Sequence, residues 1–166
     1  MILKASHSVA LLAVLGLSGM GAASCTQDGS KGALPAPAPG FALFYMDEGS
    51  SAKLAYGAPN SDDVGVMMEC AKGSNVIEVS EVARTGPSHT LDLTSQGRSA
   101  SLQAIPAGGE GEVLVIGRTR SDAPPLQAFR RSGRIDVAYA GTQYAIETNP
   151  TERSGVKRFF AACDRA

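Results

Sequence analysis

The sequence predicts a mainly β fold: an antiparallel β-sandwich, with a closed barrel as the alternative, of about nine short strands, a short helix and a C-terminal helix. Beyond residue 40, short apolar runs alternate with Gly, Pro, Asn, Asp and Ser, which is typical of an all-β domain. Several runs place an apolar side chain at every second position, as in Ile135, Val137 and Tyr139. Near the C-terminus the apolar spacing changes to three and four residues, which indicates a helix.

Each predicted strand is a run of apolar and β-branched residues that ends at a turn signal. Neighbouring runs separated by only a few residues are expected to form hairpins. The inward faces of the resulting sheets would make the core. The nine predicted strands are Phe41–Met46, Ala52–Tyr56, Val64–Cys70, Asn75–Val82, Thr90–Thr94, Ala100–Ile105, Glu112–Arg118, Arg134–Ala140 and Gln143–Glu147.

Two helices interrupt the β pattern. The short one is predicted at Pro125–Arg131, which carries apolar residues three positions apart. The longer one follows Asn149, which is suited to cap a helix, while Pro150 suits the first helical position. Glu152 stands three residues after the cap, as a capping box requires.

The C-terminal helix carries one apolar face, made of Val156, Phe159, Phe160 and Cys163. We expect this face to pack on the sheet and to bring Cys163 to Cys70, at the end of a core strand. In an oxidising compartment the two cysteines are expected to form a disulfide. Closing so long a loop would stabilise the domain by about 3–5 kcal/mol.

The first twenty-four residues have the organisation of a secretory signal. Lys4 precedes an apolar stretch from Val9 to Leu17, and small residues follow up to Cys25. The apolar stretch is much shorter than the roughly 20 residues of a membrane-spanning helix. Residues 1–24 are therefore predicted to be removed on export.

The segment Ala22-Ala23-Ser24-Cys25 resembles the lipobox of bacterial lipoproteins, in which the cysteine is acylated and becomes the new N-terminus. It differs from the usual lipobox at Ala22, where Leu is common. The resemblance implies lipid attachment at Cys25 and a place in the outer membrane, facing the periplasm. The alternative is ordinary cleavage after Ala23 or Ser24, which would give a soluble periplasmic or secreted protein with Cys25 as a free thiol or an intermolecular partner.

The number of cysteines and the position of the prolines indicate how the rest of the chain is organised. The chain has three cysteines, and acylation of Cys25 would leave Cys70 and Cys163 as a pair. Residues 25–40 are predicted to be the lipid-anchor cysteine and a Pro/Gly-rich tether, because alternating prolines favour extended polyproline II. Residues 41–166 are predicted to be a single β domain.

Charge excludes one class of partner and suggests another. Without the signal the chain has fourteen basic and sixteen acidic residues, so no overall field attracts nucleic acid and no such partner is predicted. Residues 25–112 hold eleven acidic and five basic residues, whereas residues 113–166 hold five acidic and nine basic ones. Either the two parts neutralise each other, or the second forms an arginine face that binds an envelope protein or an anionic envelope polymer. Its members would be Arg118, Arg120, Arg130, Arg131 and Arg134.

The sequence shows no motif for catalysis, metal binding or a cofactor. His89 is the only histidine after the signal, and it lies in no recognised triad motif. The glycines of residues 108–111 lack the lysine and the following helix of a phosphate loop. Asp62 and Asp63 fit turn chemistry better than a calcium site. Neither a metal nor a cofactor is predicted.

The motif Tyr56-Gly57-x-Pro59-x-Ser61-Asp62-Asp63, leading to Cys70, occurs together with Phe159-Phe160-Ala161-Ala162-Cys163 at the C-terminus. These two segments resemble a group of small secreted bacterial proteins of unknown function. The resemblance implies that Cys70 and Cys163 frame one β domain, and it implies no activity.

These features predict a lipid-anchored envelope module that binds a partner or gives structural support and has no catalytic activity. Its first partner would be the membrane, through the N-terminal lipid. One alternative is an inhibitor of an exported hydrolase. The other is a hydrolase whose catalytic residues come together only in three dimensions.

Overall fold

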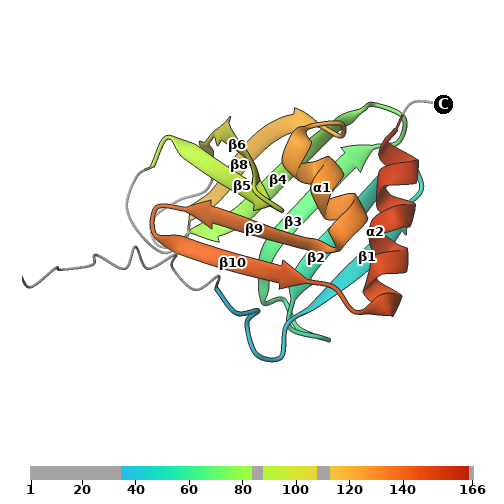
Figure 1. The fold of residues 1–166 in the computed structure, drawn as a ribbon, viewed down its shortest axis with the longest axis horizontal. Helices are drawn as coiled ribbons and strands as arrows, with labels where there is room; N and C mark the ends of the chain where they lie inside the picture. Colours follow the sequence, from blue (N-terminus) through green and yellow to red (C-terminus); the bar gives the residue numbers. More distant parts are fainter. Residues whose placement is uncertain (1–34, 84–87, 108–112, 165–166) are drawn as a thin grey trace, which may run out of the picture. The chain divides into compact units, whose positions relative to one another are not determined.

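Two antiparallel sheets face each other, and two helices lie in the same layer as the smaller sheet (Figure 1). The computed structural model describes residues 35–83, 88–107 and 113–164, which all belong to one unit spanning residues 33–166. The predicted signal peptide, Cys25 and tether residues 26–34 lie outside the described residues. Within the described ranges, no helix combines the length and the apolar character needed to cross a bilayer.

The larger sheet has six strands in the order β1-β2-β3-β4-β8-β7. All of its neighbouring strands are antiparallel. A bulge between Tyr56 and Gly57 shifts the register of the second and third strands. The strands are β1 (Ala42–Glu48), β2 (Ser51–Gly57), β3 (Val64–Ala71), β4 (Val76–Ala83), β7 (Ile105–Ala107) and β8 (Val113–Arg120).

The smaller sheet has four strands in the order β10-β9-β5-β6. Its tight turns have left-handed backbone at both central positions, as at Gln96 and Gly97, where φ is 48° and 71°. Two positive φ values match the twist of a hairpin, which favours glycine at the second position. The strands are β5 (Thr90–Ser95), β6 (Arg98–Gln103), β9 (Arg134–Tyr139) and β10 (Thr142–Glu147).

The predicted sandwich is confirmed, because the two sheets remain separate and no closed barrel forms in the described part of the chain. The predicted strand Ala100–Ile105 proves to be parts of two strands. β6 pairs in the smaller sheet and β7 pairs in the larger one, so the chain changes sheets at Ala104. The Ala104 N–H donates to the carbonyl of His89 at 3.0 Å, which satisfies the backbone at this crossing.

The core lies between the two layers and is mainly aliphatic. Side chains that alternate along the strands point into it from both sheets, and the helices add aromatic rings. Its fully buried members include Leu54, Met68, Ile77, Leu91, Leu93, Ile135, Ile146, Leu126, Phe129, Phe159 and Phe160.

Both helices begin and end as their sequences require. α1 (Pro124–Ser132) starts with two prolines and ends at Gly133, where φ is 75°. α2 (Pro150–Cys163) starts with the predicted capping box, in which the Asn149 side chain and the Glu152 side chain each accept from the other residue's backbone N–H.

α2 also closes the free edge of the larger sheet. It packs against β1 and β2, and the Glu152 carboxylate accepts the Leu43 N–H at 3.0 Å. The guanidinium of Arg158 lies 4.6 Å from the centre of the Tyr45 ring. A backbone donor that would otherwise face solvent at the edge strand therefore has a partner within the chain.

Candidate functional site: a cationic pocket between the helices

The described part of the molecule has a basic pocket between α1 and α2. Gln127, Arg130 and Arg131 line it from α1, and Arg153 and Lys157 line it from α2. Residues three or four apart lie on the same face of a helix, so each helix presents its polar face to this space. The pocket is open to solvent, has a volume of about 560 Å³ and has no acidic residue among its five lining side chains.

Apolar packing beneath the pocket fixes the distance between the helices. Leu126 and Phe129 of α1 are buried, and so are Phe159 and Phe160 of α2. The rings of Phe129 and Phe160 meet edge to face with their centres 6.3 Å apart. The cationic side chains therefore stand on the solvent side of a well-packed helix pair.

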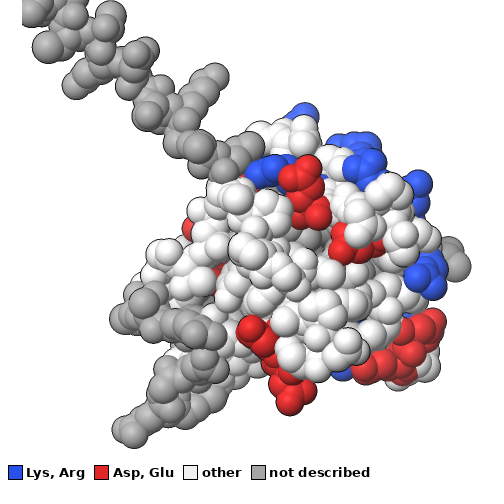
Figure 2. Space-filling view, turned by 90° about the horizontal axis from the view of Figure 1, so that it is seen from below, with Lys and Arg blue, Asp and Glu red and all other residues white. Residues whose placement is uncertain are grey.

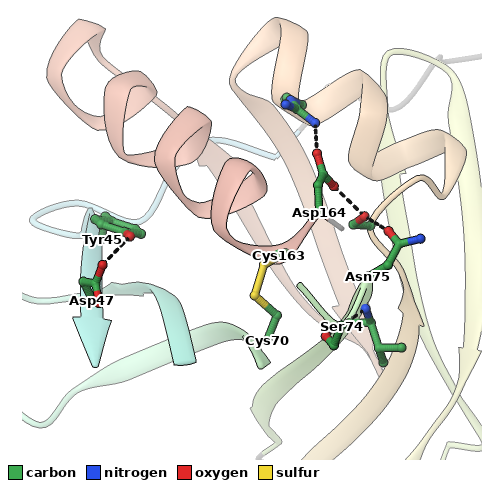
Figure 3. The surroundings of a disulfide bond; sticks show 10 residues. Tyr45, Asp47, Cys70, Ser74, Asn75, Cys163 and Asp164 are labelled. Carbon is green, nitrogen blue, oxygen red and sulfur yellow. Dashed lines mark hydrogen bonds and ion pairs between the residues drawn. A yellow bond between two sulfur atoms is a disulfide. The ribbon is translucent and has the colours of Figure 1, made fainter. Parts of the chain in front are cut away.

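A disulfide holds the C-terminal end of α2 against the larger sheet. Cys70 at the end of β3 is bonded to Cys163, with their Cα atoms 5.7 Å apart (Figure 3). The backbone N–H groups of Gly73 and Asn75 donate to the carbonyls of Ala162 and Cys163 at 2.8 and 2.9 Å. The predicted disulfide is confirmed, and it belongs to an oxidising, exported compartment.

Asp164, directly after the helix, links this end of α2 to α1. Its carboxylate accepts hydrogen bonds from Arg130 at 2.7 Å and from Ser121 at 2.8 Å (Figure 3). The Ser121 hydroxyl also contacts the side chain of Asn75. Burial acts to raise the pKa of Asp164, but the hydrogen bonds from Ser121 and Arg130 outweigh it and lower the pKa of this carboxyl. Asp164 therefore stays charged and orients Arg130.

Two of the four cationic side chains in the pocket have partners within the chain, and two have none among the described residues. Arg130 is tied to Asp164 and lies 5.6 Å from the centre of the Phe160 ring. Arg153 donates to the carbonyl of Ser132 at the end of α1. Arg131 and Lys157 are exposed, and within the described ranges neither has a hydrogen-bond or ion-pair partner. The pocket thus concentrates four positive charges, of which one is paired with an acidic residue.

The face of the molecule drawn in Figure 2 shows a similar, incomplete segregation of charge. In Figure 2 most Lys and Arg side chains lie along the upper and right-hand side, and the largest areas of Asp and Glu lie along the lower edge. Like charges that gather on one face repel one another, so this arrangement costs stability. It is also the arrangement that attracts anions.

The structure does not gather the five arginines that the sequence analysis grouped together. Arg130 and Arg131 share the pocket. Arg118 pairs with Glu78 at 2.9 Å and Arg120 with Asp122 at 2.9 Å, both away from the pocket lining. Arg134 pairs with Glu147 at 3.1 Å. Three of the five are thus in ion pairs elsewhere, because strand and loop positions direct them to other surfaces.

Arg153 and Lys157 were missed by the sequence analysis, which considered only cations close together in the chain. Their spacing of four residues on the polar face of the C-terminal helix was the available signal. The missing side chain of Gly133 leaves room for the Arg153 guanidinium. A Cβ added at position 133 would come within 2.8 Å of the Arg153 guanidinium.

Glu81 is a second residue that the sequence analysis did not single out. It is fully buried in β4, and neither of its carboxylate oxygens has a hydrogen-bond partner. Its register partners are Val66 and Val115, which are buried in the same layer. Burial raises the pKa of Glu81 from 4.5 to about 8. The available signal was its place two residues after Val79 in the alternating strand.

The remaining candidates for chemistry are turn residues. His89 is exposed, and the neighbouring Ser88 hydroxyl donates to the carbonyl of Thr90 at 3.2 Å. Asp63 donates its N–H to the Ser61 hydroxyl at 3.1 Å, as expected for a turn. No group of three or more potential metal ligands occurs within the described ranges.

No family model, curated protein or solved structure matches this chain.

Proposed function

We propose that this protein is an exported, lipid-anchored module of the bacterial cell envelope that binds an anionic envelope component without catalysing a reaction. The observation that carries the proposal is the cationic pocket, where Arg131 and Lys157 are exposed and unpaired beside two fixed arginines. A guanidinium offers a planar fork of donors that matches a phosphate or carboxylate group. The disulfide supports the exported location.

The fixed arginines make the pocket suited to binding. Arg130 and Arg153 are already oriented by Asp164 and by the Ser132 carbonyl, so little side-chain entropy is lost when an anion arrives. Arg131 and Lys157 add attraction without giving up an existing ion pair. An anion bound here would also relieve the repulsion among the four cations.

The anchoring part of the proposal rests on Cys25 and the residues before it. Two acyl chains give stable membrane attachment where one does not. We expect the mature N-terminus to be an acylated Cys25, detected by mass spectrometry, and Cys25→Ala to release the protein into the soluble fraction. An unmodified N-terminus at Ser24 or Cys25 would overturn this part.

The binding part is tested with polyphosphate, a soluble polyanion, and a chain of residues 25–166 that carries Cys25→Ser. The affinity should fall as salt rises, because exposed charges are screened over about 10 Å at 0.1 M salt. The double variant Arg131→Ser/Lys157→Ser should bind markedly less, with unchanged thermal stability. Arg118→Ser removes one exposed arginine outside the pocket and is the matched control. An equal loss of affinity for each cation removed, in Arg118→Ser and in the double variant, would show that the pocket is not the site.

A further inference from the structure

The described structure begins beside Arg134, which lies shortly after α1 and outside the pocket lining. The carbonyl of Pro35, the first described residue, accepts a hydrogen bond from the Arg134 guanidinium at 3.3 Å. Arg134 follows α1 by one residue, and its backbone N–H donates to the Ser132 hydroxyl at 3.1 Å. The carbonyl of that same Ser132 accepts from Arg153.

Covalent geometry limits how far this point can move from the anchor. Between Cys25 and Pro35 the chain reaches at most about 35 Å, since a fully extended residue spans about 3.5 Å. An acylated Cys25 would therefore keep Pro35 within about 35 Å of the membrane that contains the lipid. Tethering raises the effective concentration of the lipid headgroups around the domain, so even a site of low affinity would be largely occupied.

We propose that the pocket binds the phosphate groups of anionic lipid headgroups in the membrane that anchors the protein. This inference rests on the proposed function and names its ligand. Arg130 and Arg153 form the fixed base of the site, and Arg131 and Lys157 reach outward to the headgroups. The domain then lies with α1 and α2 against the lipid surface, and the larger sheet faces away from it.

Two observations favour a lipid surface over a soluble polymer. The pocket is open rather than enclosed, and the two unpaired cations come from different helices, so they can contact separate headgroups. The acidic side chains of Asp47, Glu48 and Glu69 belong to the first three strands, where they pair with Lys72 and Lys53. A docked domain would therefore present its basic side to the membrane and keep these carboxylates away from it.

The test uses residues 25–166 with Cys25→Ser, so that binding does not depend on the acyl chains. Vesicles of phosphatidylcholine, with and without phosphatidylglycerol, are sedimented with the protein at low ionic strength. We expect binding to the vesicles that contain phosphatidylglycerol and a loss of binding as salt is added. Each cation near an anionic surface contributes about fivefold, so Arg131→Ser/Lys157→Ser should weaken binding about 25-fold. Arg118→Ser should bind like the parent chain.

The outcomes separate this inference from the proposed function. Binding of polyphosphate without binding of phosphatidylglycerol vesicles would overturn the lipid inference and leave the proposed function standing. Binding to neither probe would overturn both. Vesicle binding that Arg118→Ser weakens about fivefold, as much as each pocket cation is expected to contribute, would show diffuse attraction and would also overturn the inference. Far-ultraviolet circular dichroism of each variant confirms that it is folded.

Discussion

Glu81 is a carboxyl group within an apolar layer, and its environment sets its chemistry. Fully buried and without a hydrogen-bond partner, it is strongly disfavoured in the charged form. Its pKa of about 8 means that it is mostly protonated at neutral pH. The unfolded chain would ionise the same group near 4.5, so the two states bind this proton with different affinities.

The free energy of unfolding should therefore fall as the pH rises from about 4.5 to about 8, by up to about 1.4 kcal/mol per pH unit. In this range the folded state keeps the proton and the unfolded state loses it. Glu81→Gln keeps the shape without the ionisation, so it should flatten this slope and stabilise the protein by about 3 kcal/mol at pH 7. Urea titrations across this pH range measure both effects.

Glu78 provides the control, because it lies in the same strand and its side chain is on the outer face, paired with Arg118. Glu78→Gln should leave the pH slope intact. A slope that is as steep in Glu81→Gln as in the parent chain would contradict the buried, unpaired position of this carboxyl.

In the first turn of α2, the Glu152 side chain has two structural roles. Glu152 accepts the N–H of its own helix cap at Asn149 at 2.7 Å and the edge-strand N–H of Leu43 at 3.0 Å. It thus joins the start of a helix to the border of a sheet that is distant in the chain.

Glu152→Ala should lower the free energy of unfolding by about 2–3 kcal/mol, since it removes a cap and leaves a strand donor without a partner. Denaturant titration measures this loss, and hydrogen exchange at the Leu43 amide should accelerate. Thr151→Ala, an exposed change in the same turn, is the control and should have little effect. A similar loss in both variants would mean that only helix propensity is involved.

Local sequence patterns predicted most elements because their causes are local. Alternating apolar residues located the strands, and Asn149 and Glu152 located the start of α2. The division between β6 and β7 could not be predicted in this way, because the sheet in which a strand pairs depends on residues far along the chain. In the site, Arg130 and Arg131 could be proposed from their proximity. The spacing of Arg153 and Lys157 places them on one helix face, but only the packing of α2 beside α1 brings them to Arg130 and Arg131.

At the scale of the whole molecule, the disulfide joins the end of β3 to the end of the chain's last helix. Cys70 and Cys163 are 93 residues apart, so the bond closes a loop that contains the whole smaller sheet and both helices. A cross-link of this length chiefly lowers the entropy of the unfolded chain. It therefore acts on the stability of every element in the loop.

Cys70→Ser/Cys163→Ser should lower the free energy of unfolding by about 3–5 kcal/mol. The melting temperature of the variant, compared with that of the oxidised parent, measures the loss. Reduction of the parent should reproduce it and should leave the variant unchanged. Free thiols at both positions in protein purified from the cell envelope would contradict the bond.

The cross-link also has a mechanical consequence for a chain that is pulled from the two ends of the folded domain. A pull applied at Pro35 and at Asp164 passes along the first three strands and then across the sulfur bridge. The 93-residue loop is shielded from the load, which removes on the order of 300 Å of possible extension. Under tension only the segment from Pro35 to Cys70 can peel from the sandwich. A linkage of this kind stays short and keeps the helices that carry the pocket folded while the first strands yield.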